Sequence, residues 1–172
     1  MNMDWNGPQG DFDPVEKQGE LLMLLSGQQV TVHTSEEPDF DYMENEDVAF
    51  VVKNPSCEED LLIELCGEFS VFFEKWHGEY PATEDGYAQM TQDVQAILAG
   101  NAGALSLYTE DGWQGTTFCP EKPGLDADAA SLLERCWNDE KPENALLEGG
   151  RLELVYWDPL ENRRFVLPAK AE

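Results

Sequence analysis

The sequence predicts an α+β fold, in which a twisted and mainly antiparallel sheet of about six to eight strands carries about three packed helices. Two pairs of alternating segments are joined by short turns, at 110–112 and at 158–162, and hairpins require antiparallel pairing. The segment 84–99 repeats its apolar residues with the period of a helix. Strands and helices do not alternate one by one, so the predicted order is α-ββββ-α-ββ-α-ββ.

Three segments carry helix signals: 14–26, 84–99 and 127–137. The first opens with Asp13-Pro14-Val15-Glu16, which puts Asp at the N-cap, Pro at the first helical position and Glu at the third. Gly27 and Gly100 follow the first two segments, where a terminating glycine is expected. The helices are therefore delimited by local signals as well as by periodicity.

Strands are predicted where apolar or β-branched residues alternate between turn residues: 28–34, 48–52, 61–66, 68–76, 104–109, 113–119, 151–157 and 163–167. Gly67 marks a bulge or kink between the third and fourth strands.

In the strand 68–76, residues alternate between the two faces of the sheet. Phe69, Val71 and Phe73 are expected to face the core. Phe72 and Trp76 then face the other side, with Glu74 between them. They must be covered by a helix or arm, or form an apolar patch for a partner.

We expect residues 1–12 to form a flexible arm and residues 13–172 to form a single α+β domain. The segment 35–47 contains seven carboxylates and is predicted to be a solvated loop.

The chain is strongly acidic, with 36 acidic residues, 10 basic residues and a formal charge of −26. Such a field repels phosphate backbones and anionic membrane surfaces, so nucleic-acid and membrane binding are not expected. It keeps a protein soluble and speeds its encounter with a basic protein. The composition therefore favours a basic protein partner, and it leaves the oligomeric state open.

The cysteines indicate a reducing compartment. Cys57, Cys66, Cys119 and Cys136 are widely spaced, and the N-terminal residues lack the basic start and apolar stretch of a signal peptide. We expect a cytoplasmic protein with reduced thiols. Phosphate-binding, dinucleotide-binding and zinc-binding motifs are not found, so no cofactor is expected.

The histidines and cysteines offer three candidate catalytic patterns. His77-Gly78-Glu79 spells the H-x-E of zinc deaminases, but the required later P-C-x-x-C is missing. His33 and His77 converging across neighbouring strands, with Glu79 nearby, remain an alternative metal or acid–base site. Cys119 is the thiol expected to be most accessible, although an acidic protein tends to raise a thiol pKa.

The acidic segment 35–47 allows a different role. It lacks the calcium spacing of an EF-hand, which leaves weak divalent binding as an open alternative. Phe40 and Tyr42 interleave with carboxylates such as Asp41, as in an anchor for a basic partner. The candidate partner-binding residues are accordingly Phe40, Asp41, Tyr42, Phe72, Trp76, His77 and Glu79, and no catalytic or metal-binding residue is assigned.

The succession GEFSVFFEKWHGEY, YAQMTQDVQAILAG and ALSLYTEDGWQGT resembles small acidic proteins of uncharacterised families in gut-type Firmicutes. The resemblance covers residues 60–118 and implies no catalytic residues. In size, charge and fold class the chain is also similar to immunity proteins of bacterial toxin systems.

The function predicted first is therefore a non-enzymatic, immunity-like or inhibitor-like module that binds a basic protein through an acidic surface. A small hydrolase or metal-dependent enzyme that uses His77 and Glu79 is the second hypothesis. An acidic mimic of nucleic acid is the third.

Overall fold

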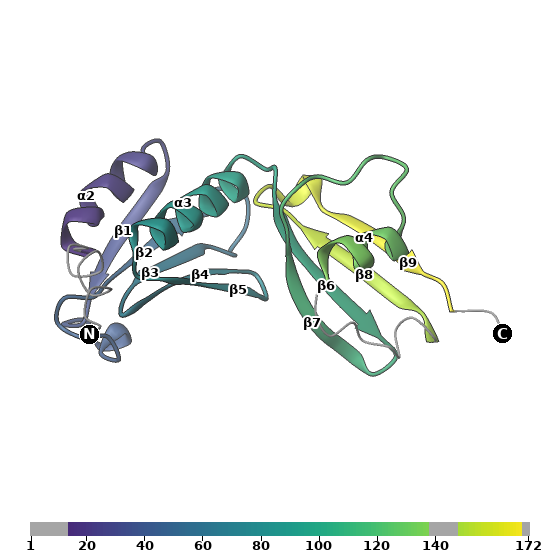
Figure 1. Cartoon of the computed structure of the whole chain (residues 1–172), viewed down its shortest axis with the longest axis horizontal. Helices are drawn as coiled ribbons and strands as arrows, with labels where there is room; N and C mark the ends of the chain where they lie inside the picture. The colour runs from purple at the N-terminus through teal and green to yellow at the C-terminus, as the bar shows by residue number, and fades with distance from the viewer. Residues whose placement is uncertain (1–13, 138–147, 170–172) are drawn as a thin grey trace, which may run out of the picture. The chain divides into compact units, whose positions relative to one another are not determined.

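The computed structural model describes residues 14–137 and 148–169, and the chain divides into two compact units. The first unit contains residues 1–73 and 77–94, and the second contains 74–76 and 95–172. Each unit has its own antiparallel sheet (Figure 1). The predicted arm 1–12 lies outside the described residues. That residues 13–172 fold as a single domain stays a prediction, because compactness alone does not show which parts fold together.

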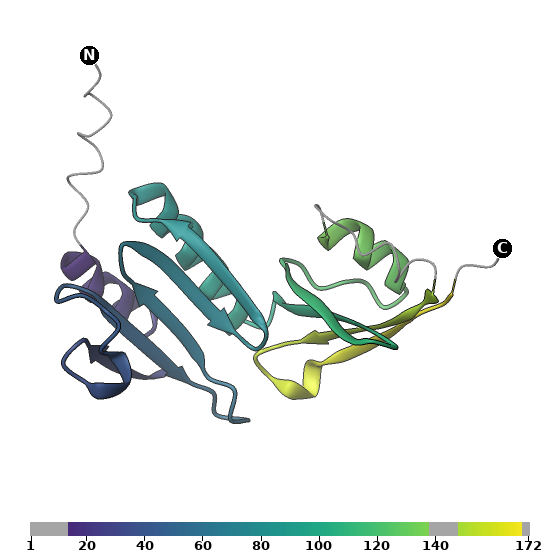
Figure 2. The same ribbon diagram turned by 90° about the horizontal axis from the view of Figure 1, so that it is seen from below.

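The first unit is built on a five-stranded meander with the order β1-β2-β3-β4-β5. Its elements are α2 (Pro14–Leu24), β1 (Gln29–Thr34), the 3-10 helix η2 (Pro38–Phe40), β2 (Val48–Lys53), β3 (Leu61–Leu65), β4 (Glu68–Phe73), β5 (Trp76–Pro81) and α3 (Glu84–Leu98). Figures 1 and 2 show α2 and α3 on the same side of this sheet.

The helix-covered face of the sheet is the core of the first unit. Phe50, Ile63 and Val71 are successive Cα partners across β2, β3 and β4, and all three are fully buried. Phe69 meets Tyr87 of α3 edge-on, with ring centroids 6.4 Å apart. The strict alternation of buried and half-buried residues along β3 and β4 follows from this one-sided cover.

The second unit contains a four-stranded sheet with the order β7-β6-β8-β9. Its elements are β6 (Gly103–Thr109), β7 (Gly112–Cys119), α4 (Ala129–Cys136), β8 (Gly150–Val155), the 3-10 helix η3 (Pro159–Glu161) and β9 (Arg163–Leu167). The amphipathic α4 covers one face of the sheet, where Leu132 and Leu133 join the buried leucines of β6 and β8 (Figure 2).

The α+β class, the antiparallel pairing and both predicted hairpins are confirmed, and the described residues contain three α-helices. The single sheet is wrong, because the described strands form two sheets with five and four strands.

The predicted strand 68–76 is two strands, since the chain turns at Glu74-Lys75 and β5 begins at Trp76. Glu74 adopts φ +56°, a conformation that non-glycine residues rarely adopt. Two-residue hairpin turns normally carry glycine or asparagine, and Glu74-Lys75 has neither. His77, which lies beyond the predicted strand 68–76, is therefore part of β5.

None of the helices in the described part of the chain is long and apolar enough to cross a membrane.

Candidate functional site

The candidate site lies on the outer face of the five-stranded sheet, which we define as the face opposite α2 and α3. One row of side chains on this face contains Val51, Leu62 and Phe72, which are successive Cα partners across β2, β3 and β4. These three residues, called the apolar row, are only half-buried. The ring of Phe72 also stacks on His77 of β5, with centroids 4.6 Å apart and planes 1° from parallel. The face therefore presents a continuous apolar and aromatic strip.

A second row on the same face contains His33, Ala49, Glu64 and Ser70, which are again successive Cα partners. The acidic loop, residues 35–47, folds onto this row. Phe40 stacks on His33 with ring centroids 4.5 Å apart. The Tyr42 hydroxyl donates a hydrogen bond to the Glu64 carboxylate. Met43, the next residue of the loop, is buried.

Hydrogen bonds hold the loop in this position. The Glu37 carboxylate bonds with Nδ1 of His33 at 2.8 Å and accepts the backbone N–H of Thr34 at 3.1 Å. These two bonds lower the pKa of Glu37, the imidazole bond most strongly. Near the end of the loop, the backbone N–H of Glu44 donates to Asp47 at 2.9 Å. The loop is thus folded onto the sheet, while most of its residues are exposed to solvent, as the prediction of a solvated loop expected.

The aromatic side chains of the loop contact the sheet, whereas most of its carboxylates remain exposed to solvent. The exposed ones are Glu36, Asp39, Asp41, Glu44 and Glu46. Residues 29–81 contain fourteen acidic residues against two basic ones, a difference of −12. Burial, together with the carboxylates of Asp47 and Glu64, raises the pKa of Cys66 to about 12, which reflects the negative field here. The outer face therefore combines an apolar strip with a dense negative charge.

Of the seven predicted partner-binding residues, all but Trp76 lie on the outer face or on the loop that folds onto it. Phe40, Asp41 and Tyr42 belong to the acidic loop. Phe72 is on the outer face, and so is His77, whose ring stacks on it.

Glu79 shares the face of His77, since the two are separated by one residue on β5, and His77 Nε2 lies 3.7 Å from Glu79 Oε1. Trp76 is on the opposite face of β5, together with Tyr80, and is buried. It groups with the second unit, where its ring is 4.7 Å from Phe118. Because the chain turns at Glu74-Lys75, the alternation of faces along β4 does not continue to Trp76. The prediction that Trp76 shares a face with Phe72 was therefore wrong.

The two histidines do not converge. His33 is on β1 and His77 is on β5, the two edges of the sheet, so four strand spacings or about 19 Å separate them. One metal ion cannot bind both side chains at this separation. Both ring nitrogens of His33 are also engaged, by Glu37 and by Thr31 Oγ1 at 2.9 Å. Within residues 14–137 and 148–169, no three His, Cys, Asp or Glu side chains are grouped to hold a metal ion.

The prediction that Cys119 is the most accessible thiol is wrong. Cys119 is 1% exposed, and it belongs to the core of the second unit. Cys57 and Cys66, in the first unit, are the half-buried thiols.

Sequence reasoning missed two features of the described surface. The sequence placed Val51 and Leu62 in strands but did not show which face of the sheet they occupy. Their position beside Phe72 depends on the register of three strands.

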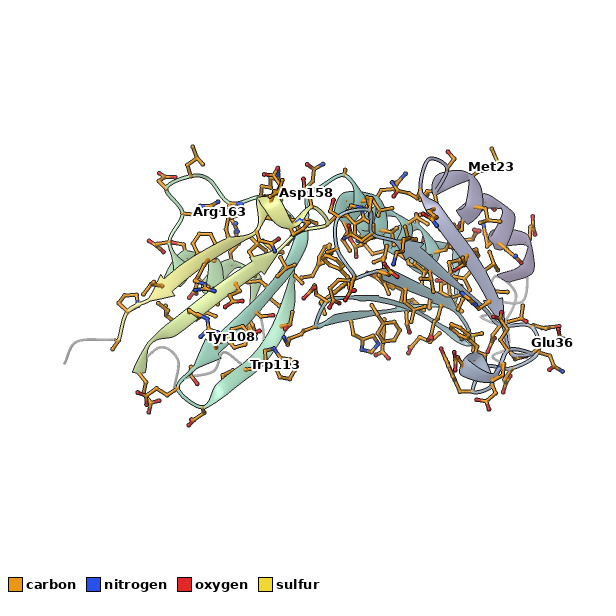
Figure 3. All side chains as sticks on the ribbon, turned by 180° about the vertical axis from the view of Figure 1, so that it is seen from behind. Met23, Glu36, Tyr108, Trp113, Asp158 and Arg163 are labelled. Atoms are coloured by element: carbon orange, nitrogen blue, oxygen red, sulfur yellow. The ribbon has the colours of Figure 1, made fainter. Side chains whose placement is uncertain are left out.

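The face of the four-stranded sheet opposite α4 was also missed. There Tyr108 pairs with Trp113, and the Arg151 guanidinium lies 4.4 Å from the Tyr108 ring (Figure 3). Alternation along 104–109 and 151–157 would have placed Tyr108 and Arg151 away from the core.

Comparison of the chain with protein-family models, with curated proteins and with solved structures gave no match. The resemblance to small acidic Firmicutes proteins and to immunity proteins therefore stays a prediction.

Proposed function

We propose that this protein is a non-enzymatic binding module that engages a basic protein partner through the outer face and the acidic loop. The observation that carries the proposal is the folding of the loop onto the sheet. Phe40 on His33 and Tyr42 on Glu64 fix the loop beside the apolar row. Exposed carboxylates thereby border a half-exposed aromatic strip in one rigid surface.

The apolar row supplies the kind of contact that dominates protein–protein affinity. Interfaces have an apolar, aromatic centre that excludes water and a polar rim. Phe72 and the stacked His77 ring form such a centre, and Val51 and Leu62 extend it. Because these side chains lie on strands, little conformational entropy is lost when a partner covers them.

The carboxylates of the loop form the polar rim and select a partner whose surface is positively charged. The net charge of −12 over residues 29–81 attracts a surface rich in Lys and Arg and repels acidic ones. We propose a basic enzyme or toxin as the partner, with this protein acting as its cytoplasmic inhibitor or immunity protein. The size, charge and fold class noted above support that role by analogy.

A paired variant experiment tests the proposal. Phe72→Ser removes the centre of the apolar row, and Met23→Ser removes an equally apolar side chain, 78% exposed on α2, away from the outer face. Tagged wild type and both variants are used to capture proteins from a lysate of the source cells at low salt. A basic protein retained by wild type and by Met23→Ser, but at least tenfold depleted with Phe72→Ser, is the expected result.

The salt dependence of that complex provides the second readout. Association driven by the acidic loop slows steeply as the ionic strength rises from about 0.05 to 0.5 M, because the Debye length falls below 10 Å. Retention of the same proteins by all three forms, or an association rate that does not respond to salt, would contradict the proposed surface.

A further inference from the structure

The second unit contains two cysteines brought together from separate elements. Cys119 is the last residue of β7, and Cys136 is the last residue of α4. The Thr117 hydroxyl donates to the Cys136 carbonyl at 3.2 Å. Because Thr117 and Cys119 share one face of β7, this bond holds the end of α4 over Cys119. Both side chains belong to the buried core cluster of the second unit, at 1% and 7% exposure.

The environment makes the two sulfurs unequal. The one S–H of Cys119 donates to the Glu121 carbonyl at 3.2 Å. The neighbouring Cys119 side chain, followed by the side chain of Arg135, lowers the pKa of Cys136. The neighbouring Cys136 side chain, with burial, raises the pKa of Cys119. Cys136 is thus the better thiolate and nucleophile, and Cys119 keeps its proton.

We propose that Cys119 and Cys136 are a redox pair that closes reversibly into a disulfide between β7 and α4. The oxidant is a small-molecule disulfide of the glutathione class. The Cys136 thiolate attacks one sulfur of that disulfide, so that a mixed disulfide forms and one small thiolate leaves. Cys119 then loses its proton and attacks the Cys136 sulfur, expelling the second small thiolate. Two protein thiols are oxidised, and the small disulfide is reduced to two thiols.

The bond would have a clear structural effect. The chain between the two cysteines contains α4, so the disulfide closes residues 119–136 into a loop and pins the helix to the sheet edge. Closing a loop of this length restricts the unfolded chain and stabilises the native state. The proposed pair lies in the second unit, so its test is independent of partner binding at the outer face.

Peptide mapping tests the proposal directly. The full-length folded protein is equilibrated with mixtures of oxidised and reduced glutathione, quenched with acid, alkylated and digested with trypsin. Cleavage after Lys53, Lys75, Arg135 and Arg151 puts Cys57 and Cys66 in one peptide, Cys119 in a second and Cys136 in a third. The expected product is a cross-link between the second and third peptides, with an intact mass lower by about 2 Da.

Matched variants separate this pair from the other thiols. The double variant Cys57→Ser/Cys66→Ser should form the cross-link as wild type does, while Cys136→Ser and Cys119→Ser should not. Oxidised wild type should unfold at a temperature higher by about 10 °C than the reduced protein. Wild type alone decides the question if a variant fails to fold.

Three results would overturn the proposal: full alkylation of both thiols at every glutathione ratio, a stable glutathione adduct on Cys136 without cross-link, or a cross-link that forms only in urea.

Discussion

Replacing Phe40 by Ala should release the acidic loop from the sheet. Phe40 contributes a ring stacked on His33 at 4.5 Å, and its side chain is half-buried. An aromatic pair contributes about 1 kcal/mol beyond its buried area, and burying half of a phenyl side chain contributes about 1 kcal/mol more. Loss of about 2 kcal/mol raises the population of the open loop by a factor of about 30.

Amide hydrogen exchange measures this opening. Within the loop, the backbone N–H groups of Phe40, Met43 and Asp47 donate to the carbonyls of residues 37, 40 and 44 at 2.9, 3.1 and 3.0 Å. Their exchange should accelerate by about 30-fold in Phe40→Ala, while amides of β3 and β4 stay protected.

Met23→Ala is the control, because Met23 is 78% exposed on α2 and should leave the loop unchanged. Loop amides that exchange as slowly in Phe40→Ala as in wild type would refute the reasoning, since the loop would then be held by other contacts.

Four further substitutions probe the first unit. Gly86→Ala should destabilise it by about 2 kcal/mol or more in urea titrations, because the added Cβ would lie 1.9 Å from a carbonyl oxygen. Gly19→Ala in α2 should instead stabilise it by up to about 1 kcal/mol, because no atom lies within 4 Å of the added Cβ and alanine favours a helix. Tyr80→Phe removes a 2.6 Å hydrogen bond to Asp93 of α3 and should lower the stability by about 1 kcal/mol, measured by calorimetry. The bonds that lower the pKa of Glu37 below its ordinary value of 4.5 stabilise the fold when the pH is above 4.5. Glu37→Gln should therefore destabilise the protein at neutral pH, and this effect should vanish as the pH falls through the lowered pKa. Urea unfolding followed by circular dichroism at a series of pH values measures it.

The parts of the fold with strong local signals could be predicted from the sequence. In α3, Met90, Val94 and Ile97 repeat with the helical period, and all three are fully buried. The Asp111-Gly112 pair predicted the β6–β7 turn, where Gly112 has a φ of +101°. Both features depend on a few neighbouring residues, so no knowledge of the tertiary structure was needed.

The parts that depend on distant pairing could not be predicted. Local signals show that a strand exists, but they do not show which sheet it joins, and the nine described strands divide into two sheets. The turn at Glu74-Lys75 was missed because its residue with positive φ is a glutamate, and neither glycine nor asparagine marks the turn in the sequence. Because this one turn was missed, the prediction put Trp76 on the wrong face of the sheet and did not include His77 in a strand.

The same limit explains how the interpretation of the acidic loop changes. Composition showed aromatics interleaved with carboxylates, and this pattern suggested that Phe40 and Tyr42 anchor a partner. The contacts show that Phe40 packs on His33 and Tyr42 bonds with Glu64, so both side chains hold the loop to its own sheet. The aromatic contact left for a partner is then Phe72 with its stacked histidine.

The two roles can be separated by experiment. Phe40→Ala should weaken partner binding only to the extent that the loop opens, and raising the salt concentration should reduce its effect, because the loop contributes charge. Phe72→Ser should weaken binding at every salt concentration while loop amide protection stays intact, because it removes apolar contact area. A loop that opens in Phe72→Ser would mean that Phe72 also supports the loop, and the apolar row could no longer be assigned to the partner alone.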